Sequence, residues 1–184
     1  MRHQLPTVLI LASGRGERFT ASGGAVHKLR APLGSTTVLE HTLAAVRASG
    51  LPWHVEDEGH PGMGDSIAAA VRATATAPGW LVLPGDLPLV LPETLSSIAA
   101  VLADCAVAVP VHQGKRGHPV GFAAECLSGL LALAGEQGAA SVVRQQAQQK
   151  RVRWLEVEDA GTVTDIDTVQ DLARAEAVLA ARRT

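Results

Sequence analysis

Short apolar runs alternate along this chain with segments in which apolar residues recur at helical spacing. The apolar runs predict strands at residues 8–11, 52–56, 80–84, 105–110, 119–122 and 152–157. The helical spacing predicts helices at residues 36–49, 65–75, 92–103, 126–134, 139–149 and 168–181. This alternation indicates an α/β fold, in which helices cover both faces of a mostly parallel sheet. Because no repeat or linker interrupts the pattern, we expect residues 1–184 to form a single domain.

Local signals mark several of the predicted helix ends. Gly50 is placed as a C-terminal cap, and Pro92 suits the first turn of its helix. Asp65-Ser66 is expected to be the N-cap of the alanine-rich helix predicted at residues 65–75. Thr168 and Asp171 resemble a capping box in which aspartate replaces the usual glutamate or glutamine.

The first apolar run ends in a loop rich in glycine and arginine, Gly14-Arg15-Gly16-Glu17-Arg18. Glycines let backbone N–H groups approach phosphate oxygens, and arginines bind those oxygens through charge-assisted hydrogen bonds. The loop therefore predicts a polyphosphate site. It lacks the dinucleotide fingerprint, since Phe19 stands where the third glycine belongs, and the P-loop pattern, since Leu29 follows Lys28. An ordinary strand-to-helix turn with solvated arginines is the alternative interpretation.

Two further segments of small residues follow in the sequence. Residues 20–28 are expected to form either a mobile loop that closes over a ligand or a disordered surface loop. Residues 59–64 form a second glycine-rich turn. Ligands of parallel sheets bind at the carboxyl ends of the strands, and this rule brings the first loop and the 62–66 turn to one edge together with Asp86.

Carboxylates follow two of the predicted elements. Asp86 comes directly after a buried strand, where a rigidly held carboxylate can bind Mg²⁺ shared with phosphate oxygens, although a simple turn aspartate is the alternative. Asp165 and Asp167 are the second source, and Asp165 is the freer candidate because it lies upstream of the predicted cap. With the basic side chains of Arg15, Arg18 and Lys28, these carboxylates predict a metal–triphosphate site. The reaction would need positioning and charge neutralisation but no covalent nucleophile.

Histidines and serines add little to this picture. His118 is expected either to contact a phosphate or substrate edge or to be a turn histidine with a solvent partner, and His27 has the same alternatives. The other histidines show no ligand spacing such as H-x-x-x-H. Ser13 and Ser66 have no partner histidine and carboxylate that the sequence can place, so hydrolase catalysis is unsupported.

Composition excludes several classes of protein. Apolar residues make up 47% and charged residues 18% of the chain, which argues against disorder. A net charge of −2 and few aromatic residues argue against a nucleic-acid partner. No apolar run approaches the length of a membrane span, and no signal-peptide pattern is present, so we expect a cytoplasmic protein without a membrane partner. Cys105 and Cys126 have no metal or redox spacing and are expected to be small core residues.

With these residues in place, the chain resembles the nucleotidyltransferases of molybdenum-cofactor maturation. The matching motifs are Leu11-Ala12-Ser13-Gly14-Arg15-Gly16-Glu17-Arg18-Phe19, Lys28-Leu29, Pro32-Leu33-Gly34, Gly62-Met63-Gly64-Asp65-Ser66-Ile67, Pro84-Gly85-Asp86-Leu87-Pro88-Leu89, Arg116-Gly117-His118-Pro119-Val120-Gly121-Phe122 and Asp165-Ile166-Asp167-Thr168. They span nearly the whole chain in the family's order. The resemblance implies a Rossmann-like, three-layer α/β/α fold of the glycosyltransferase-A type.

The resemblance also implies roles for the matching residues. The first loop, Leu11 to Gly16, would wrap the triphosphate, with Arg18 and Lys28 on phosphates, and Asp86 and Asp165 would hold Mg²⁺. The turn containing Gly62, Gly64 and Ser66 would lie near the base or ribose. The segment that contains His118 would face the acceptor.

The G-M-x-x-S and R-G-H-P-V-x-F motifs are more similar to the cytidylyltransferase branch than to the guanylyltransferase branch. The implied reaction joins CTP to a molybdopterin-type phosphate and releases pyrophosphate, and a molybdoenzyme would receive the product. The alternatives are a guanylyltransferase, a sugar-phosphate nucleotidyltransferase and a non-catalytic nucleotide- or cofactor-binding relative.

The chain departs from the family pattern in two places. The loop between Phe19 and Lys28 is longer than usual. The stretch from Gly50 to Gly62 is too short for the usual strand–helix–strand, so one strand–helix unit is expected to be absent beside the base pocket.

Overall fold

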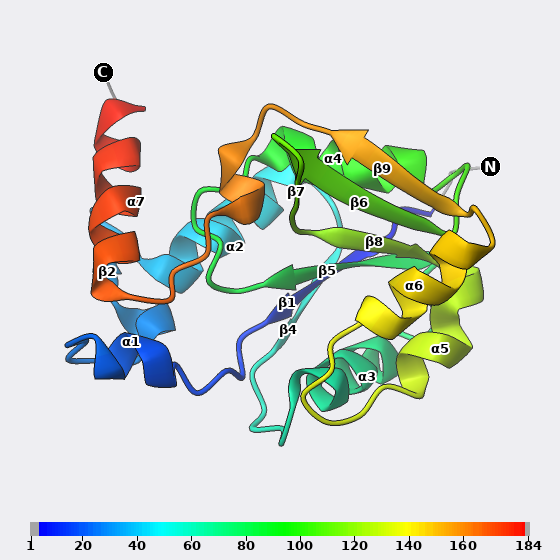
Figure 1. Cartoon of the computed structure of the whole chain (residues 1–184), viewed down its shortest axis with the longest axis horizontal. Helices are drawn as coiled ribbons and strands as arrows, with labels where there is room; N and C mark the ends of the chain where they lie inside the picture. Colours follow the sequence, from blue (N-terminus) through cyan, green and yellow to red (C-terminus); the bar gives the residue numbers. More distant parts are fainter. Residues whose placement is uncertain (1–3, 183–184) are drawn as a thin grey trace.

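A seven-stranded sheet forms the centre of the molecule in the computed structural model, which describes residues 4–182 (Figure 1). Its strands, in spatial order, are β4 (Trp53–Glu56), β1 (Thr7–Leu11), β5 (Gly79–Pro84), β8 (Val120–Ala123), β6 (Val107–His112) and β7 (Lys115–Arg116), and β9 (Val152–Glu156) also pairs with β6. Strands β4, β1, β5, β6 and β9 point in one direction, whereas β8 and β7 run against them. The predicted mostly parallel sheet is confirmed, with β8 as an antiparallel strand inside it.

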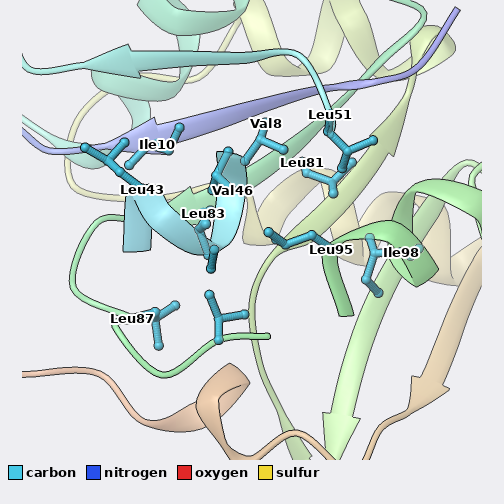
Figure 2. Packing of buried hydrophobic residues seen from close by; sticks show 13 residues of the cluster. Val8, Ile10, Leu43, Val46, Leu51, Leu81, Leu83, Leu87, Leu95 and Ile98 are labelled. Carbon is cyan, nitrogen blue, oxygen red and sulfur yellow. The ribbon is translucent and has the colours of Figure 1, made fainter. Parts of the chain in front are cut away.

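Alternating residues of the strands pack on opposite faces of the sheet, as the pleat requires. Val8 and Ile10 of β1 belong to one apolar cluster, whereas Leu9 belongs to another. The first cluster lies under α2 (Val38–Ser49) and α4 (Pro92–Val101) (Figure 2). The second lies under α3 (Met63–Ala73), α5 (Leu127–Leu131) and α6 (Ala140–Gln148). Helices therefore cover both faces, in the three layers that the sequence predicts.

A third apolar cluster joins the two ends of the described chain. It contains Phe19 of α1 (Glu17–Ala21), Leu29 of the 3₁₀ helix η1 (Lys28–Arg30), Leu33 of the β2–β3 hairpin (Pro32–Leu33 and Thr36–Thr37) and Ala175 of α7 (Val169–Ala181). Ile166, just before α7, is fully buried in it. Figure 1 shows α7 beside β2 and α1. This packing brings the last carboxylates of the sequence to the first loop.

Local structure differs from the sequence expectations at several points. Helix α3 begins at Met63 with Gly62 as its N-cap, so the expected N-cap at Asp65-Ser66 is wrong. Both residues lie in the first turn, where the Asp65 carboxylate accepts the Gly135 N–H at 2.8 Å. The segment at 20–28, expected to be a loop, has its first two residues in α1. The residues that follow β6 turn back and pair with it as the antiparallel strand β7.

Short 3₁₀ helices complete the fold. Helix η2 (Ala124–Cys126) leads into α5, and η3 (Ala160–Val163) precedes the segment that carries the last carboxylates. Between α2 and α3 the strand β4 is the one regular element. Among residues 4–182, no helix is both long and apolar enough to cross a membrane.

The capping box predicted at the start of α7 is present. The Asp171 N–H donates to Thr168 Oγ1 at 3.2 Å, and the Thr168 N–H donates to Asp171 Oδ2 at 2.8 Å. Although partial burial acts to raise the pKa of Asp171, hydrogen bonds from Thr168 and from the Asp167 N–H outweigh it and lower that pKa. Since the helix start follows the carboxylates at 165 and 167, this cap helps to hold them in place.

Replacing Thr168 by alanine is expected to lower the free energy of unfolding by about 1 kcal/mol, because the Asp171 N–H loses its side-chain acceptor. Urea denaturation at neutral pH measures the change. Ser96→Ala on α4 is the matched control, because the Ser96 hydroxyl is exposed and bonds only to a carbonyl of its own helix. An effect of Thr168→Ala no larger than that of Ser96→Ala would contradict the capping role.

Candidate active site

A pocket of about 520 Å³ lies at the carboxyl ends of β1 and β5, where the sheet rule places a ligand. It is lined by Leu11, Ser13, Gly14, Arg15, Gly16, Glu17, Arg18, Phe19, Lys28, Leu29, His60, Pro61, Gly62, Met63, Ser66, Pro84, Asp86, Glu136 and Asp167. These residues come from the first loop, the start of α3, the end of β5 and the two segments around 136 and 167. The pocket thus gathers parts of the chain that are far apart in sequence.

Most of the predicted site residues line this pocket. They are Leu11, Ser13, Gly14, Arg15, Gly16, Arg18, Lys28, Gly62, Ser66 and Asp86. Ala12, Gly64, His118 and Asp165 do not line it. The pocket also contains Glu17, His60 and Glu136, which carry polar side chains and were not predicted to be site residues, and Asp167, which was named with Asp165 as a source of carboxylates.

Hydrogen bonds hold the first loop in shape. Ser13 Oγ lies 2.8 Å from Ser66 Oγ, which ties the loop to the start of α3. His27 Nδ1 accepts the Leu29 N–H at 3.3 Å, so its Nε2 carries the proton and donates to the Gly14 carbonyl at 2.6 Å. Gly16 precedes α1 with φ of 67°, a left-handed conformation that favours glycine. His27 thus bonds to the backbone on both sides of the loop and helps to fix it, a role that differs from both alternatives expected for it.

Lys28 lies between two carboxylates at the centre of the site. Its Nζ is 2.6 Å from Asp86 Oδ2 and 3.1 Å from Asp167 Oδ1. Arg18 contacts the other oxygen of Asp167 at 2.6 Å. Burial acts to lower the pKa of Lys28, but the charges and hydrogen bonds of Asp86 and Asp167 outweigh it and raise that pKa. Lys28 is therefore a firmly charged ammonium ion held by acidic groups.

Three carboxylates face one another here, and we call Asp86, Asp165 and Asp167 the carboxylate cluster. One oxygen from each lies within 4.8 Å of the others. Partial burial and the charges of Asp167 and Asp86 raise the pKa of Asp165. Asp86 Oδ1 is buried and has no hydrogen-bond partner among residues 4–182. An orphaned carboxylate oxygen beside two further carboxylates fits a hard divalent cation such as Mg²⁺ or Mn²⁺.

The backbone fixes where these carboxylates stand. The Gly85 N–H donates to the Leu11 carbonyl at 2.9 Å, which joins the ends of β5 and β1. The Ile166 N–H donates to the Asp86 carbonyl at 3.0 Å, so the 165–167 segment is bound directly to the residue that it faces. Asp165 was the freer candidate of the two because Asp167 adjoins the predicted cap, which Thr168 and Asp171 form between themselves, and the structure places the Asp167 side chain against Lys28.

The predicted residues outside the pocket have other surroundings. Ala12 donates its N–H to the Glu56 carbonyl at 2.8 Å, in the sheet. Gly64 packs against the backbone of the 134–137 segment, where an added Cβ would lie 2.7 Å from the Gln137 carbonyl oxygen. His118 is half-buried; burial lowers the pKa of its imidazole, and the charge of Asp86 acts in the opposite direction. Asp165 belongs to the carboxylate cluster at the edge of the pocket.

Solved structures with the same fold cover almost the whole chain. Rv0371c from Mycobacterium tuberculosis is 25% identical, with a TM-score of 0.78 over 96% of this chain and 100% of that one. A nucleotidyl transferase from Methanothermobacter is 22% identical, with a TM-score of 0.80 over 97% and 99% of the two chains. Molybdopterin-guanine dinucleotide biosynthesis protein A from Archaeoglobus fulgidus is 20% identical, with a TM-score of 0.65 over 95% and 99%. The latter two likenesses establish the shared fold.

Curated relatives match a smaller part. Bifunctional protein GlmU from Coxiella burnetii is 31% identical over 114 aligned residues, and the match covers 50% of this chain and 24% of the relative. GlmU from Alkalilimnicola ehrlichii is 30% identical over 119 residues, 53% of this chain and 25% of the relative. The aligned region is thus about a quarter of the length of these relatives.

The family model of the MobA-like NTP transferase domain matches residues 44–152, more than half of the chain. The matched range includes Asp86 and the 62–66 turn, and the full-length structural likeness extends to the first loop and to the 165–167 segment. The predicted family resemblance is confirmed: the chain belongs to the MobA-like NTP transferase domain family.

Proposed function

We propose that this protein transfers a nucleoside monophosphate from a nucleoside triphosphate to a phosphorylated acceptor and releases pyrophosphate. CTP is the favoured nucleotide and a molybdopterin-type phosphate the favoured acceptor. One observation carries the proposal: beside the glycine-rich loop, Lys28 contacts Asp86 and Asp167, and Arg18 contacts Asp167, in one pocket. Cations for phosphate and carboxylates for a metal are the two parts that a nucleotidyltransferase needs.

The residues of the first loop are proposed to hold the triphosphate. Ser13, Gly14 and Gly16 line the pocket with little side-chain bulk, so backbone N–H groups can approach phosphate oxygens. The side chains of Arg15 and Arg18 are largely exposed and pair with Glu17 and Asp167, and we propose that they exchange these contacts for phosphate oxygens. Lys28 then exchanges part of its contact with Asp86 and Asp167 for phosphate. The Gly62–Ser66 turn is proposed to lie beside the base or ribose.

Mg²⁺ is the proposed cofactor, and the carboxylate cluster fits it through the orphaned Asp86 Oδ1 and the grouping of the three carboxylates. Asp86 and Asp165 are the proposed ligands, and Asp167 joins them. When bound, such an ion neutralises charge on the triphosphate and orients it. A structure of Rv0371c in complex with manganese, 25% identical to this chain, supports a divalent metal in the family.

The chemistry proposed is a displacement at the α-phosphorus. A phosphate oxygen of the acceptor forms the new P–O bond, and the bond to the β,γ-pyrophosphate breaks with its electron pair going to the leaving oxygen. Lys28, Arg15 and Arg18 are placed to offset the negative charge on the phosphates, and the loop holds the reacting groups in line. No side chain needs to form a covalent intermediate.

The choice of acceptor and of nucleotide base rests on two sequence motifs. The motifs around Gly62–Ser66 and Arg116–Phe122 favour CTP and molybdopterin through their similarity to the cytidylyltransferase branch, and His118 is proposed to face the acceptor. A molybdoenzyme is the proposed recipient of the product. A sugar phosphate is the second candidate acceptor, because the curated relatives that match half of this chain are GlmU proteins.

One domain over residues 1–184 is the proposed organisation, supported by a sheet that draws strands from β1 to β9.

Replacing Arg18 by alanine is expected to raise the KM for the nucleotide by about tenfold, because one charge-assisted contact to phosphate is lost. The assay is pyrophosphate release at varied nucleotide concentration with saturating metal and acceptor. Arg47→Ala on α2 is the control, since its side chain pairs with Glu40 away from the pocket. An unchanged KM in Arg18→Ala would show that this loop does not bind the phosphates.

A further inference from the structure

A second group of potential metal ligands lies at the end of β4, outside the carboxylate cluster. His54, Glu56, Glu58 and His60, here called the His–Glu cluster, recur at every second position of the sequence. In a strand, residues two apart point to the same face, so His54 and Glu56 of β4 share one side of the sheet. The loop that follows brings His60 back onto Glu56. This spacing differs from the H-x-x-x-H pattern of a metal site on a helix.

The Glu56 carboxylate is the centre of the His–Glu cluster. Glu56 is only 6% exposed. Its Oε1 accepts the His60 Nε2 proton at 3.1 Å and the Glu58 N–H at 3.2 Å, and its Oε2 lies 3.7 Å from His54 Nε2. Two imidazole nitrogens from different segments thus face one buried carboxylate.

His54 Nε2 supplies an independent indication of a ligand. The atom is buried and has no hydrogen-bond partner within residues 4–182. A buried polar atom without a partner is costly, and such atoms call for a specific explanation such as an ion. One ligand atom each from Glu56, Glu58 and His60 lies within 4.8 Å of the others, which is compatible with a shared cation after small side-chain movements.

We propose that Glu56, Glu58 and His60, whose ligand atoms lie within 4.8 Å of one another, form a site for a borderline divalent transition metal, with Zn²⁺ as the ion and with His54, whose Nε2 is 3.7 Å from Glu56 Oε2, as a further nitrogen donor. Two imidazole nitrogens and a carboxylate are a common donor set for Zn²⁺. Imidazole ligands distinguish this site from the carboxylate cluster, whose oxygen donors suit Mg²⁺ or Mn²⁺. The chain therefore offers two sites of different metal preference.

The His–Glu cluster also touches the pocket. His60 lines it, and Gly62, which caps α3, follows two residues later. A metal held by His54, Glu56 and His60 would fasten residues 57–61 to the end of β4 and so fix one wall of the pocket. The effect on nucleotide binding rests on the proposed function, whereas the metal site itself does not.

Zinc binding is tested by calorimetric titration of the full chain carrying Asp86→Asn and Asp167→Asn, which removes the competing carboxylates. One equivalent of Zn²⁺ is expected to bind. Adding His54→Gln and His60→Gln is expected to weaken that binding at least about tenfold. Adding His112→Gln instead is the matched control, because three strands separate β6 from β4 in the sheet.

The far-UV circular dichroism and the melting temperature of each metal-free chain verify that it folds. If the variant with both histidines replaced does not fold, His60→Gln alone, which changes only the loop, takes its place in the titration. Visible absorption of bound Co²⁺ reports the coordination geometry. Absence of Zn²⁺ binding in the chain with both aspartates replaced, or binding that the histidine substitutions leave unchanged, would overturn the proposal. Because no nucleotide is present, failure here leaves the nucleotidyltransferase proposal standing.

Discussion

Replacing Asp86 by asparagine is expected to lower kcat for pyrophosphate release by at least about a hundredfold while the fold survives. The substitution keeps the shape of the side chain but removes its charge. Asp86 Oδ2 binds Lys28, and the buried Oδ1 has no partner among the described residues, so this carboxylate is the best-placed ligand for a cation. A neutral amide holds a divalent cation poorly, which leaves the charge on the triphosphate uncompensated.

The measurement is kcat with saturating nucleotide and acceptor, together with the melting temperature. Asp104→Asn is the matched control, because Asp104 is exposed in the loop before β6 and does not line the nucleotide pocket. The experiment also separates an enzyme from a non-catalytic nucleotide-binding relative, in which the same change would alter affinity alone. Turnover of Asp86→Asn within a few fold of the unaltered protein would refute the metal assignment.

Replacing Lys28 by methionine is expected to have two opposite effects. Turnover falls, because the triphosphate loses a cation. Affinity for Mn²⁺ without nucleotide rises at least about tenfold, because the ammonium ion that lies 2.6 Å from Asp86 and 3.1 Å from Asp167 no longer competes for these carboxylates. Under the proposed function, Lys28 would offset the charge of the carboxylate cluster until the negatively charged nucleotide binds it.

Calorimetry with Mn²⁺ in the absence of nucleotide measures the second effect. Lys115→Met is the matched control, because Lys115 is exposed on β7. If Lys28→Met binds Mn²⁺ no more tightly than Lys115→Met does, the two cations do not compete for the same carboxylates.

Periodicity predicts the elements of this fold better than their arrangement. The strand at 80–84 is a continuous apolar run because both faces of β5 are covered, and this signal needs no tertiary information. The direction of β8 cannot be predicted in this way, because its sequence is as apolar as that of a parallel strand. Its pairing with β5 and β6 in the folded chain shows that it is antiparallel. The β2–β3 hairpin is too short for any period to emerge.

Motifs predict the site where the chemistry is local. The glycine–arginine loop and Asp86 each adjoin an apolar strand, and the structure places both at the pocket. Asp167 is harder to interpret from the sequence because it adjoins a helix start, and the packing of Ile166 and α7 shows that its side chain faces Lys28. Gly64 leaves room for the backbone of the 134–137 segment, a close approach that the motif alone does not reveal.

The most direct test of nucleotidyl transfer is pyrophosphate release with CTP, GTP, ATP and UTP, each with Mg²⁺ and either molybdopterin or a sugar phosphate as acceptor. We expect release that requires an acceptor and is fastest with CTP and molybdopterin. Release with GTP or with the sugar phosphate instead would support nucleotidyl transfer but show that the substrates are different. Binding of nucleotide without release of pyrophosphate in any combination would contradict the proposal that this protein is a nucleotidyltransferase.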